Sequence, residues 1–182
     1  IKNVLDRAER SIHRCDLIIE ELLNYSRAQT LVLERTNIND WLNRLLGEES
    51  PPEGILVERE LNTEAQSVKM DRERFRRCLV NILTNSYHAI QEKSDNSLDG
   101  HVKVISEKND NGIKISISDN GVGIGREVLS RVFEPLYSTK PFGVGLGLPI
   151  TKQIVEMHGW DINISGEPGK GAVVTINIPF LL

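Results

Sequence analysis

Two runs of alternating apolar and polar residues, His101–Lys108 and Gly112–Asp119, are joined by the turn Asn109-Asp110-Asn111-Gly112. An Asn-Gly pair between such runs is a strong signal for a two-stranded antiparallel hairpin. A second hairpin is predicted from Asp161–Ser165 and Ala172–Pro179, which a glycine-rich turn connects. Strands joined by short turns exclude a sheet built from helical crossovers, which a dinucleotide-binding βαβ unit requires.

Helical periodicity marks other parts of the chain. Apolar residues recur at helical spacing from Asp71, a good N-cap, to about Gln91, and again from Leu148 to His158, where Gly159 is a stop signal. Further predictions are a helix over Thr36–Glu49 capped by Asn37 or Asn39, strands over Ile55–Leu61 and Gln66–Met70, and a short helix around Glu127–Val132. This mixture predicts an α+β fold, a two-layer α/β sandwich with one mixed, mostly antiparallel sheet covered by helices.

The first residues carry a different pattern. Apolar side chains alternate in steps of four and three from Ile1 to Leu22, which predicts a long helix that packs in a bundle. Such a helix buries too little surface to be stable alone, so it needs a partner helix or chain, or it folds back on its own domain. Because the pattern is already under way at Ile1, we expect the chain to be a fragment of a longer protein.

The composition argues against some classes of binding partner. The chain of 182 residues has a formal net charge of -4, so it has no general attraction to nucleic acid or to an anionic membrane, and we expect no nucleic-acid partner. Any phosphate binding must come from local geometry. Cys15 and Cys78 lie in helical apolar patterns, which favours buried, reduced thiols. With no spanning segment or signal peptide, we expect a cytoplasmic chain, which is compatible with a membrane-anchored parent.

Three polar residues share one face of the helix predicted over 71–91. Asn81, Asn85 and His88 stand at i, i+4 and i+7. An amide oxygen is a hard, neutral ligand that suits Mg²⁺, whose other ligands come from water and substrate phosphates, so Asn85 is the candidate metal ligand. The alternative is that the three residues form an ordinary solvent face.

Two glycine-rich segments follow. In Asp119-Asn120-Gly121-Val122-Gly123, a carboxylate at a strand end can accept from an amine, and the glycines permit a close backbone approach. In Gly143-Val144-Gly145-Leu146-Gly147-Leu148, backbone amides at a helix N-terminus can bind phosphate, although an ordinary loop would have the same composition.

In this order and spacing, the segments resemble the histidine kinase catalytic domain of the GHKL ATPase superfamily, which has the Bergerat ATP-binding fold. The stretch 81–90 resembles the N box, 119–123 the first glycine box, Phe133–Tyr137 with Ser138-Thr139-Lys140 the F box, and 143–148 the second glycine box. Residues 1–35 resemble part of the second helix of a dimerisation and phosphotransfer hairpin, which leaves 36–182 as the catalytic domain.

The resemblance implies a role for each matching residue. Asn85 would bind Mg²⁺, Asn81 and His88 would lie near the phosphates of ATP, and Lys140 would reach toward them from a lid over about 124–142. Asp119 would accept from the exocyclic amine of adenine. The remaining nucleotide-binding residues would be Gly121, Gly123, Gly143, Gly145, Leu146 and Gly147.

The resemblance also implies a reaction. Hydrolytic members of the superfamily place a glutamate where this chain has Asn81, and an amide cannot act as a general base. We therefore expect transfer of the γ-phosphoryl group to a histidine on a dimerisation helix, in the same or a partner subunit of a homodimeric parent, with a response regulator as the further partner. His13 does not match the family's acceptor motif, and His101 and His158 are interpreted as structural. A nucleotide-sensing module and a GHKL ATPase or protein serine kinase are the alternatives.

Overall fold

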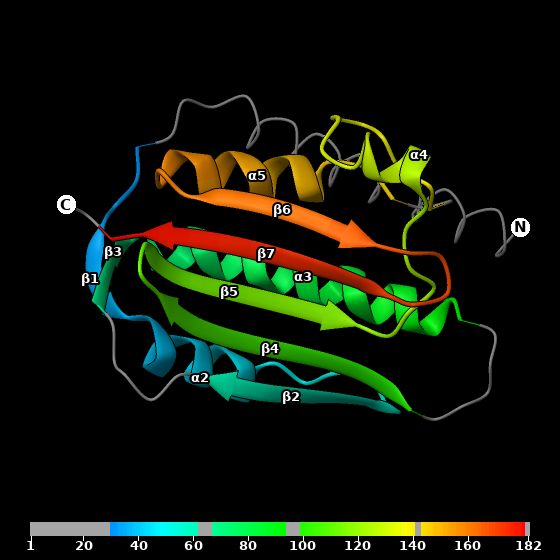
Figure 1. Cartoon of the computed structure of the whole chain (residues 1–182), viewed down its shortest axis with the longest axis horizontal. Helices are drawn as coiled ribbons and strands as arrows, with labels where there is room; N and C mark the ends of the chain where they lie inside the picture. The colour runs from blue at the N-terminus through cyan, green and yellow to red at the C-terminus, as the bar shows by residue number, and fades with distance from the viewer. Residues whose placement is uncertain (1–29, 62–66, 94–98, 141–142, 181–182) are drawn as a thin grey trace, which may run out of the picture.

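The computed structural model describes residues 30–61, 67–93, 99–140 and 143–180. Its elements, labelled in Figure 1, are β1 (Glu34–Asn37), α2 (Ile38–Glu48), β2 (Ile55–Leu61), β3 (Ser67–Met70), α3 (Arg72–Gln91), β4 (Gly100–Asn109), β5 (Gly112–Asp119), α4 (Arg126–Leu129), α5 (Gly147–Met157), β6 (Asp161–Gly166) and β7 (Ala172–Pro179). The long helix predicted at Ile1–Leu22 lies outside the described residues.

Five strands form one mixed sheet in the order β2-β4-β5-β7-β6. The two predicted hairpins, β4–β5 and β6–β7, are antiparallel, as is the β5–β7 pair. Only the β2–β4 pair within this sheet is parallel, with Ile55 opposite Gly100. The predicted α+β sandwich with a mostly antiparallel sheet is therefore confirmed.

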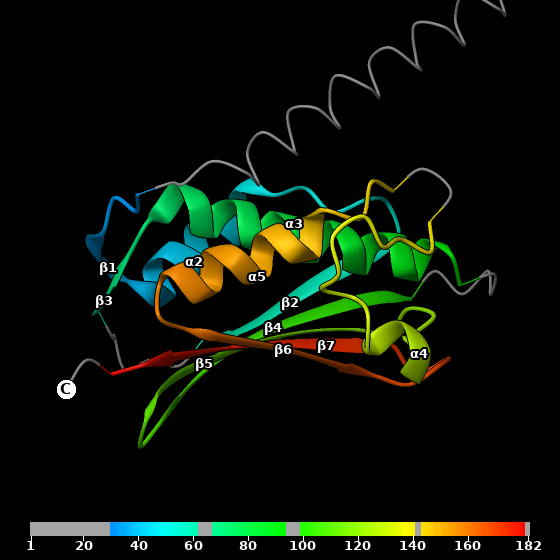
Figure 2. The same cartoon turned by 90° about the horizontal axis from the view of Figure 1, so that it is seen from above.

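The helices α2, α3 and α5 lie side by side on one face of the sheet, and the short α4 lies near one end of it (Figure 2). Between the helix layer and the sheet lies the core, to which α3 contributes Phe75 and Ile82 and the strands contribute Val102, Ile115 and Ile176. These side chains alternate along the strands with polar ones, which explains why one face of the sheet is apolar. Cys78 is buried in this core, and burial raises the pKa of its thiol to about 12, as expected for an inert structural cysteine.

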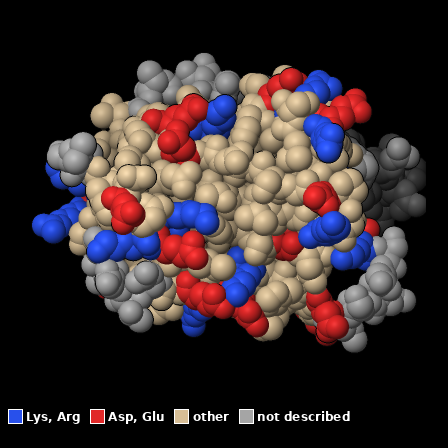
Figure 3. Space-filling model, in the orientation of Figure 1, with Lys and Arg blue, Asp and Glu red and all other residues tan. Residues whose placement is uncertain are grey.

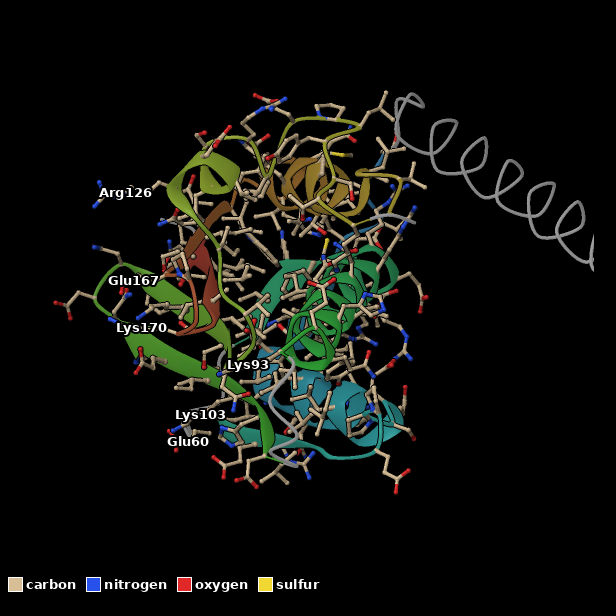
Figure 4. The ribbon with its side chains drawn as sticks, turned by 90° about the vertical axis from the view of Figure 1, so that its right-hand side faces the viewer. Glu60, Lys93, Lys103, Arg126, Glu167 and Lys170 are labelled. Atoms are coloured by element: carbon tan, nitrogen blue, oxygen red, sulfur yellow. The ribbon has the colours of Figure 1, made fainter. Side chains whose placement is uncertain are left out.

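The other face of the sheet is open and polar. Figure 3 shows this face, where acidic and basic side chains are interspersed. Ion pairs join neighbouring strands, as between Lys103 Nζ and the Glu60 carboxylate at 2.6 Å, which Figure 4 shows together at the β2–β4 edge. The mixed signs agree with the small net charge and give this face no strong field of either sign.

The start of α3 is a junction between three parts of the chain. The Asp71 carboxylate caps the helix by accepting from the Arg74 N–H at 3.1 Å, and it also accepts from the Val32 N–H at 3.0 Å. The Asp71 N–H donates to Nε2 of His158, which follows α5, at 2.9 Å. One residue therefore ties the segment before β1 and the end of α5 to α3, and the structural interpretation of His158 agrees with this position.

Two predicted elements differ from the structure. The helix predicted from Thr36 begins at Ile38, because Thr36 and Asn37 belong to β1, which pairs antiparallel with β3 in a separate two-stranded sheet. Asn37 is the N-cap, and its side-chain oxygen accepts from the N–H groups of Asn39 and Asp40. The helix predicted at Glu127–Val132 is shorter and is α4. The domain boundary predicted between residues 35 and 36 falls inside β1.

Candidate functional site

Lys140 connects the segment between α4 and α5 to the polar stripe of α3. Its Nζ donates to the Asn85 Oδ1 at 3.1 Å and lies 3.3 Å from the His88 Nδ1. Asn85 and His88 lie one helical turn apart on α3, so one ammonium group reaches both. The structure thus brings together three residues that the sequence placed in two separate motifs.

The Asn85 oxygen accepts a hydrogen bond from a cationic group, the Lys140 ammonium. Burial among these side chains lowers the pKa of the Lys140 ammonium, because desolvation disfavours the charged form. No group of three or more His, Cys, Asp or Glu side chains among the described residues could hold a metal ion. A metal at this position would therefore take the Asn85 amide oxygen as its protein ligand and complete its shell with phosphate and water oxygens, which is a donor set that suits Mg²⁺.

Asn81 lies against the beginning of α5. Its Nδ2 donates to the Thr151 Oγ1 at 3.0 Å, and a Cβ added to Gly147 would lie only 2.3 Å from the Asn81 Oδ1. Thr151 is buried, and its carbonyl also accepts from the Cys78 thiol. Asn81 therefore fixes the N-terminal turn of α5 against α3, and Gly147 is required for that close contact.

The N-terminal turn of α5 has the features of an anion site. Leu146 is fully buried at the N-cap position, and no described side chain caps this end. Pro149 stands in the first turn, where a missing N–H is tolerated. The N–H groups at the start of such a helix have no partner within the helix, and the helix dipole adds a partial positive charge there.

Residues 133–140 and 143–145 contact one another and α5 at several points. Lys152 of α5 lies over the Phe133 ring at 5.1 Å, and the Leu136 N–H donates to the Gly145 carbonyl at 3.0 Å. Leu136 has a φ of 65°, an uncommon conformation for a side chain of this size. Gly145 has a φ of 75° and Gly143 lies next to Ser138, so both glycines pack against this segment.

Asp119, the last residue of β5, is the centre of a second cluster. Its Oδ1 accepts from the N–H groups of Gly121 at 3.0 Å and Ala172 at 3.2 Å. The buried Ser86 of α3 lies near the same carboxylate and favours its charged form. Burial raises the pKa of the Asp119 carboxyl, while these hydrogen bonds and the nearby Lys93 oppose that rise. Lys93, labelled in Figure 4, donates to the Asn120 carbonyl at 2.8 Å.

The glycines after Asp119 permit close contacts within the protein. A Cβ on Gly121 would lie 2.6 Å from the backbone of Ala89, and one on Gly123 would lie 1.9 Å from the Glu167 carbonyl oxygen. The Val122 N–H donates to the Ala89 carbonyl at 3.0 Å, which ties this loop to α3. These glycines are thus needed to bring the loop against α3 and the β6–β7 turn, whatever they contact in a ligand.

Residues of α3 belong to both clusters, the one around Lys140 and the one around Asp119. Asn85 and His88 contact Lys140, and Asn81 contacts α5. Ala89 contacts the loop that follows β5, and Ser86 lies near Asp119. Sequence reasoning missed Ser86, Thr151 and Lys93 as members of the site. Ser86 and Thr151 could have been noticed as polar residues at core positions of their helices, whereas nothing in the pattern marks Lys93.

The chain from residue 70 to 182 matches a protein family described as "Histidine kinase-, DNA gyrase B-, and HSP90-like ATPase". The chain belongs to this family. The sensor histidine kinase ZraS of Escherichia coli (strain K12) is 29% identical over 169 residues, which are 91% of this chain and 35% of ZraS. Sporulation kinase C of Bacillus subtilis (strain 168) is 29% identical over 182 residues, which are 98% of this chain and 41% of that protein. The chain spans about two fifths or less of these relatives.

Solved structures of family members have the same architecture. Histidine kinase ThkA, in complex with response regulator protein TrrA, superimposes with a TM-score of 0.76 at 27% identity, covering 99% of this chain and 51% of ThkA. Full-length ShkA in complex with AMPPNP gives a TM-score of 0.79 at 24% identity, covering 95% of this chain and 37% of ShkA, which supports the fold. None of the described helices combines the length and apolar character needed to span a bilayer.

Proposed function

We propose that this chain is the catalytic part of a sensor histidine kinase, which binds Mg²⁺-ATP and transfers its γ-phosphoryl group to a histidine. The observation that carries the proposal is the contact between Lys140 and the Asn85 oxygen. It places a cationic side chain from the segment before α5 beside the candidate metal ligand of α3, which is an arrangement suited to a polyphosphate. Family membership and the similarity to named histidine kinases support the same assignment.

Different residues of the site would bind different parts of ATP. Asp119 would accept from the exocyclic amine of adenine, while the N–H groups at the start of α5 and the Lys140 ammonium would bind the phosphates. Bound Mg²⁺ neutralises phosphate charge, and the Asn85 oxygen would be its protein ligand. His88, next to Lys140, and Asn81, which holds the first turn of α5, would keep these groups in place.

Position 81, where hydrolytic members of the superfamily have a glutamate that activates water, carries an amide in this chain. Asn81 carries an amide that cannot remove a proton, and its Nδ2 is already engaged by the Thr151 hydroxyl. Positioning and charge neutralisation would therefore hold ATP for an incoming nucleophile rather than for hydrolysis. This is the property expected of a phosphotransferase whose acceptor is a separate side chain.

The partners belong to the same proposal. We infer that residues 1–35 are part of the second helix of a dimerisation hairpin, that the acceptor histidine is on the first helix of that hairpin, and that the parent is a homodimer. A response regulator would then receive the phosphoryl group, an inference supported by the similarity to ThkA, whose structure contains the response regulator TrrA.

Transfer to a supplied acceptor tests the proposal. The chain is incubated with radiolabelled ATP, Mg²⁺ and a separate polypeptide that carries a matching acceptor-histidine helix, and the same polypeptide with that histidine changed to Gln is the control. We expect acid-labile label on the first polypeptide only. Normal ATP binding without any labelling would contradict the kinase assignment, and sustained ATP hydrolysis by the chain alone would favour an ATPase.

A further inference from the structure

Thr151 is the buried polar residue of α5, with 1% of its surface exposed. The other buried residues of this helix are Pro149, Ile150, Ile154 and Val155, which are all apolar. A hydroxyl group buried among them loses its contact with water, so it needs a hydrogen-bond partner within the protein. That partner is the Asn81 Nδ2, which donates to the Thr151 Oγ1 at 3.0 Å from the neighbouring helix α3 (Figure 2).

The Asn81 carboxamide spans one turn of α5. Its Nδ2 lies at Thr151, and its Oδ1 lies at Gly147, where an added Cβ would be 2.3 Å from Oδ1 and 3.0 Å from Nδ2. Gly147 and Thr151 are four residues apart, so they lie one above the other on the same face of the helix. The Thr151 hydroxyl therefore determines which end of the amide points toward Gly147.

The backbone of Thr151 is also bound to α3. The Cys78 thiol, three residues before Asn81, donates to the Thr151 carbonyl at 3.8 Å. Thr151 is thus fixed to α3 by two contacts, and the Asn81 amide extends this restraint to Gly147, the first residue of α5. The N–H groups of that first turn are those without a partner within the helix.

We propose that Thr151 is a positioning residue for nucleotide binding, which acts through Asn81 to hold the first turn of α5 where its N–H groups meet the phosphates. The inference rests on the proposed function, because it requires the start of α5 to bind phosphate. Thr151 itself needs no contact with the nucleotide. Backbone donors that are already held in place bind a ligand more tightly than donors that must first be ordered.

The change Thr151→Val removes the hydroxyl and keeps the shape of the side chain. The Asn81 amide then loses its partner and can turn, so the first turn of α5 is no longer held against α3 by an oriented group. Thr151→Ser keeps a hydroxyl at the same position and is the conservative comparison. Thr151→Ala removes the hydroxyl without adding a methyl group in its place, and it repeats the test if the valine variant does not fold.

The chain supplies a matched control at the other end of α3. Thr36 of β1 is also buried, with 4% of its surface exposed, and its Oγ1 accepts from the Arg72 Nε at 2.8 Å. Thr36→Val therefore removes a buried hydroxyl and its hydrogen bond from a part of the fold that has no role in the proposed site.

The experiment measures dissociation constants for Mg²⁺-ATP by calorimetry, with thermal unfolding to confirm that each variant is folded. Loss of the hydrogen bond predicts about five- to tenfold weaker binding by Thr151→Val, whereas Thr151→Ser and Thr36→Val stay within about twofold of the wild type. Asn81→Ala is the second background. Because Thr151 acts through Asn81, adding Thr151→Val to Asn81→Ala should weaken binding by less than about twofold further.

The coupling between the two positions separates this role from a purely structural one. The inference is overturned if Thr151→Val keeps the wild-type affinity, if it weakens binding by the same factor with and without Asn81, or if folded Thr151→Ser behaves like Thr151→Val. Should Asn81→Ala bind too weakly for the second comparison, the Thr151→Ser result decides. If the wild type binds no Mg²⁺-ATP at all, the proposed function itself fails, which distinguishes the two.

Discussion

His158 has a defined protonation state because both ring nitrogens are engaged. Nε2 lies 2.9 Å from the Asp71 N–H, which can only donate, so Nε2 must accept. Nδ1 lies 2.7 Å from the Ile154 carbonyl oxygen, which can only accept, so Nδ1 carries the proton. The ring also packs against Trp160, with centroids 4.6 Å apart. The neutral imidazole is therefore part of the native structure.

This state predicts a pH dependence of stability. Burial lowers the pKa of His158 below its ordinary value of 6.5, although the nearby Asp71 carboxylate opposes that change. Above the unfolded pKa both states are neutral and the stabilisation is complete. As the pH falls, the unfolded chain takes up the proton before the native state does, so the free energy of unfolding decreases.

The variant His158→Gln isolates this effect, since glutamine can accept from the Asp71 N–H but does not titrate. Urea unfolding at pH 7.5 and pH 5.5 should show a larger loss of stability for the wild type than for the variant. Titrations shared by both proteins cancel in this comparison. An equal loss in the two proteins would contradict the neutral assignment.

At the scale of elements, the loop after β5 and the β6–β7 turn are held together through glycines. Gly171 has a φ of 82°, and a Cβ there would lie 1.8 Å from the Asp119 carbonyl oxygen. The Gly169 N–H donates to the Val122 carbonyl at 2.7 Å, so the two loops are joined by their backbones. Any side chain at position 171 would have to separate them.

Gly171→Ala is therefore expected to destabilise the fold by roughly 2–4 kcal/mol, because the new methyl group meets backbone atoms and the positive φ is strained. Gly47→Ala is the matched control, since Gly47 lies in α2 and a Cβ there meets nothing within 4 Å. Its helical position predicts a gain of about 0.5–1 kcal/mol. Denaturant titrations check both values, and equal effects of the two substitutions would contradict this account.

The sequence predicted the elements whose signals are local. The Asn-Gly turn predicted the β4–β5 hairpin, and Asp71 with the apolar stripe after it predicted α3. The sequence did not predict which strands pair when they lie far apart in the chain. The parallel β2–β4 pair and the β1–β3 ribbon depend on which strands meet in space, and Thr36 was assigned to a helix because four residues are too few to show a strand period.

In the candidate site, too, the sequence predicted residues that belong to motifs but not the contacts between elements. Asn85, Asp119 and Lys140 were found through motifs, and the structure places Lys140 against Asn85. The hydrogen bond from Asn81 to Thr151 joins α3 to α5, and the one from the Val122 N–H to the Ala89 carbonyl joins the loop after β5 to α3. Such contacts follow from the packing of the helix layer on the sheet, which periodicity does not encode.

At the scale of the whole molecule, α3 connects the two ends of the proposed nucleotide. One face of α3 contacts Lys140 and α5, and Ala89 of the same helix contacts the loop that follows Asp119. Figures 1 and 2 show α3 beside α5 and across from β5. The helix layer and the sheet together set this spacing. In the proposed complex, the metal and the phosphates therefore lie at Asn85 and the adenine base lies at Asp119.

Mg²⁺-dependent ATP binding by the wild type, Asn85→Ala and Asp119→Ala tests this central claim most directly. The account predicts that the wild type binds ATP with an affinity that falls when Mg²⁺ is removed. Asn85→Ala should abolish the dependence on Mg²⁺, and Asp119→Ala should weaken binding by about tenfold or more while the dependence remains. Two folded variants that bind Mg²⁺-ATP as the wild type does would contradict it.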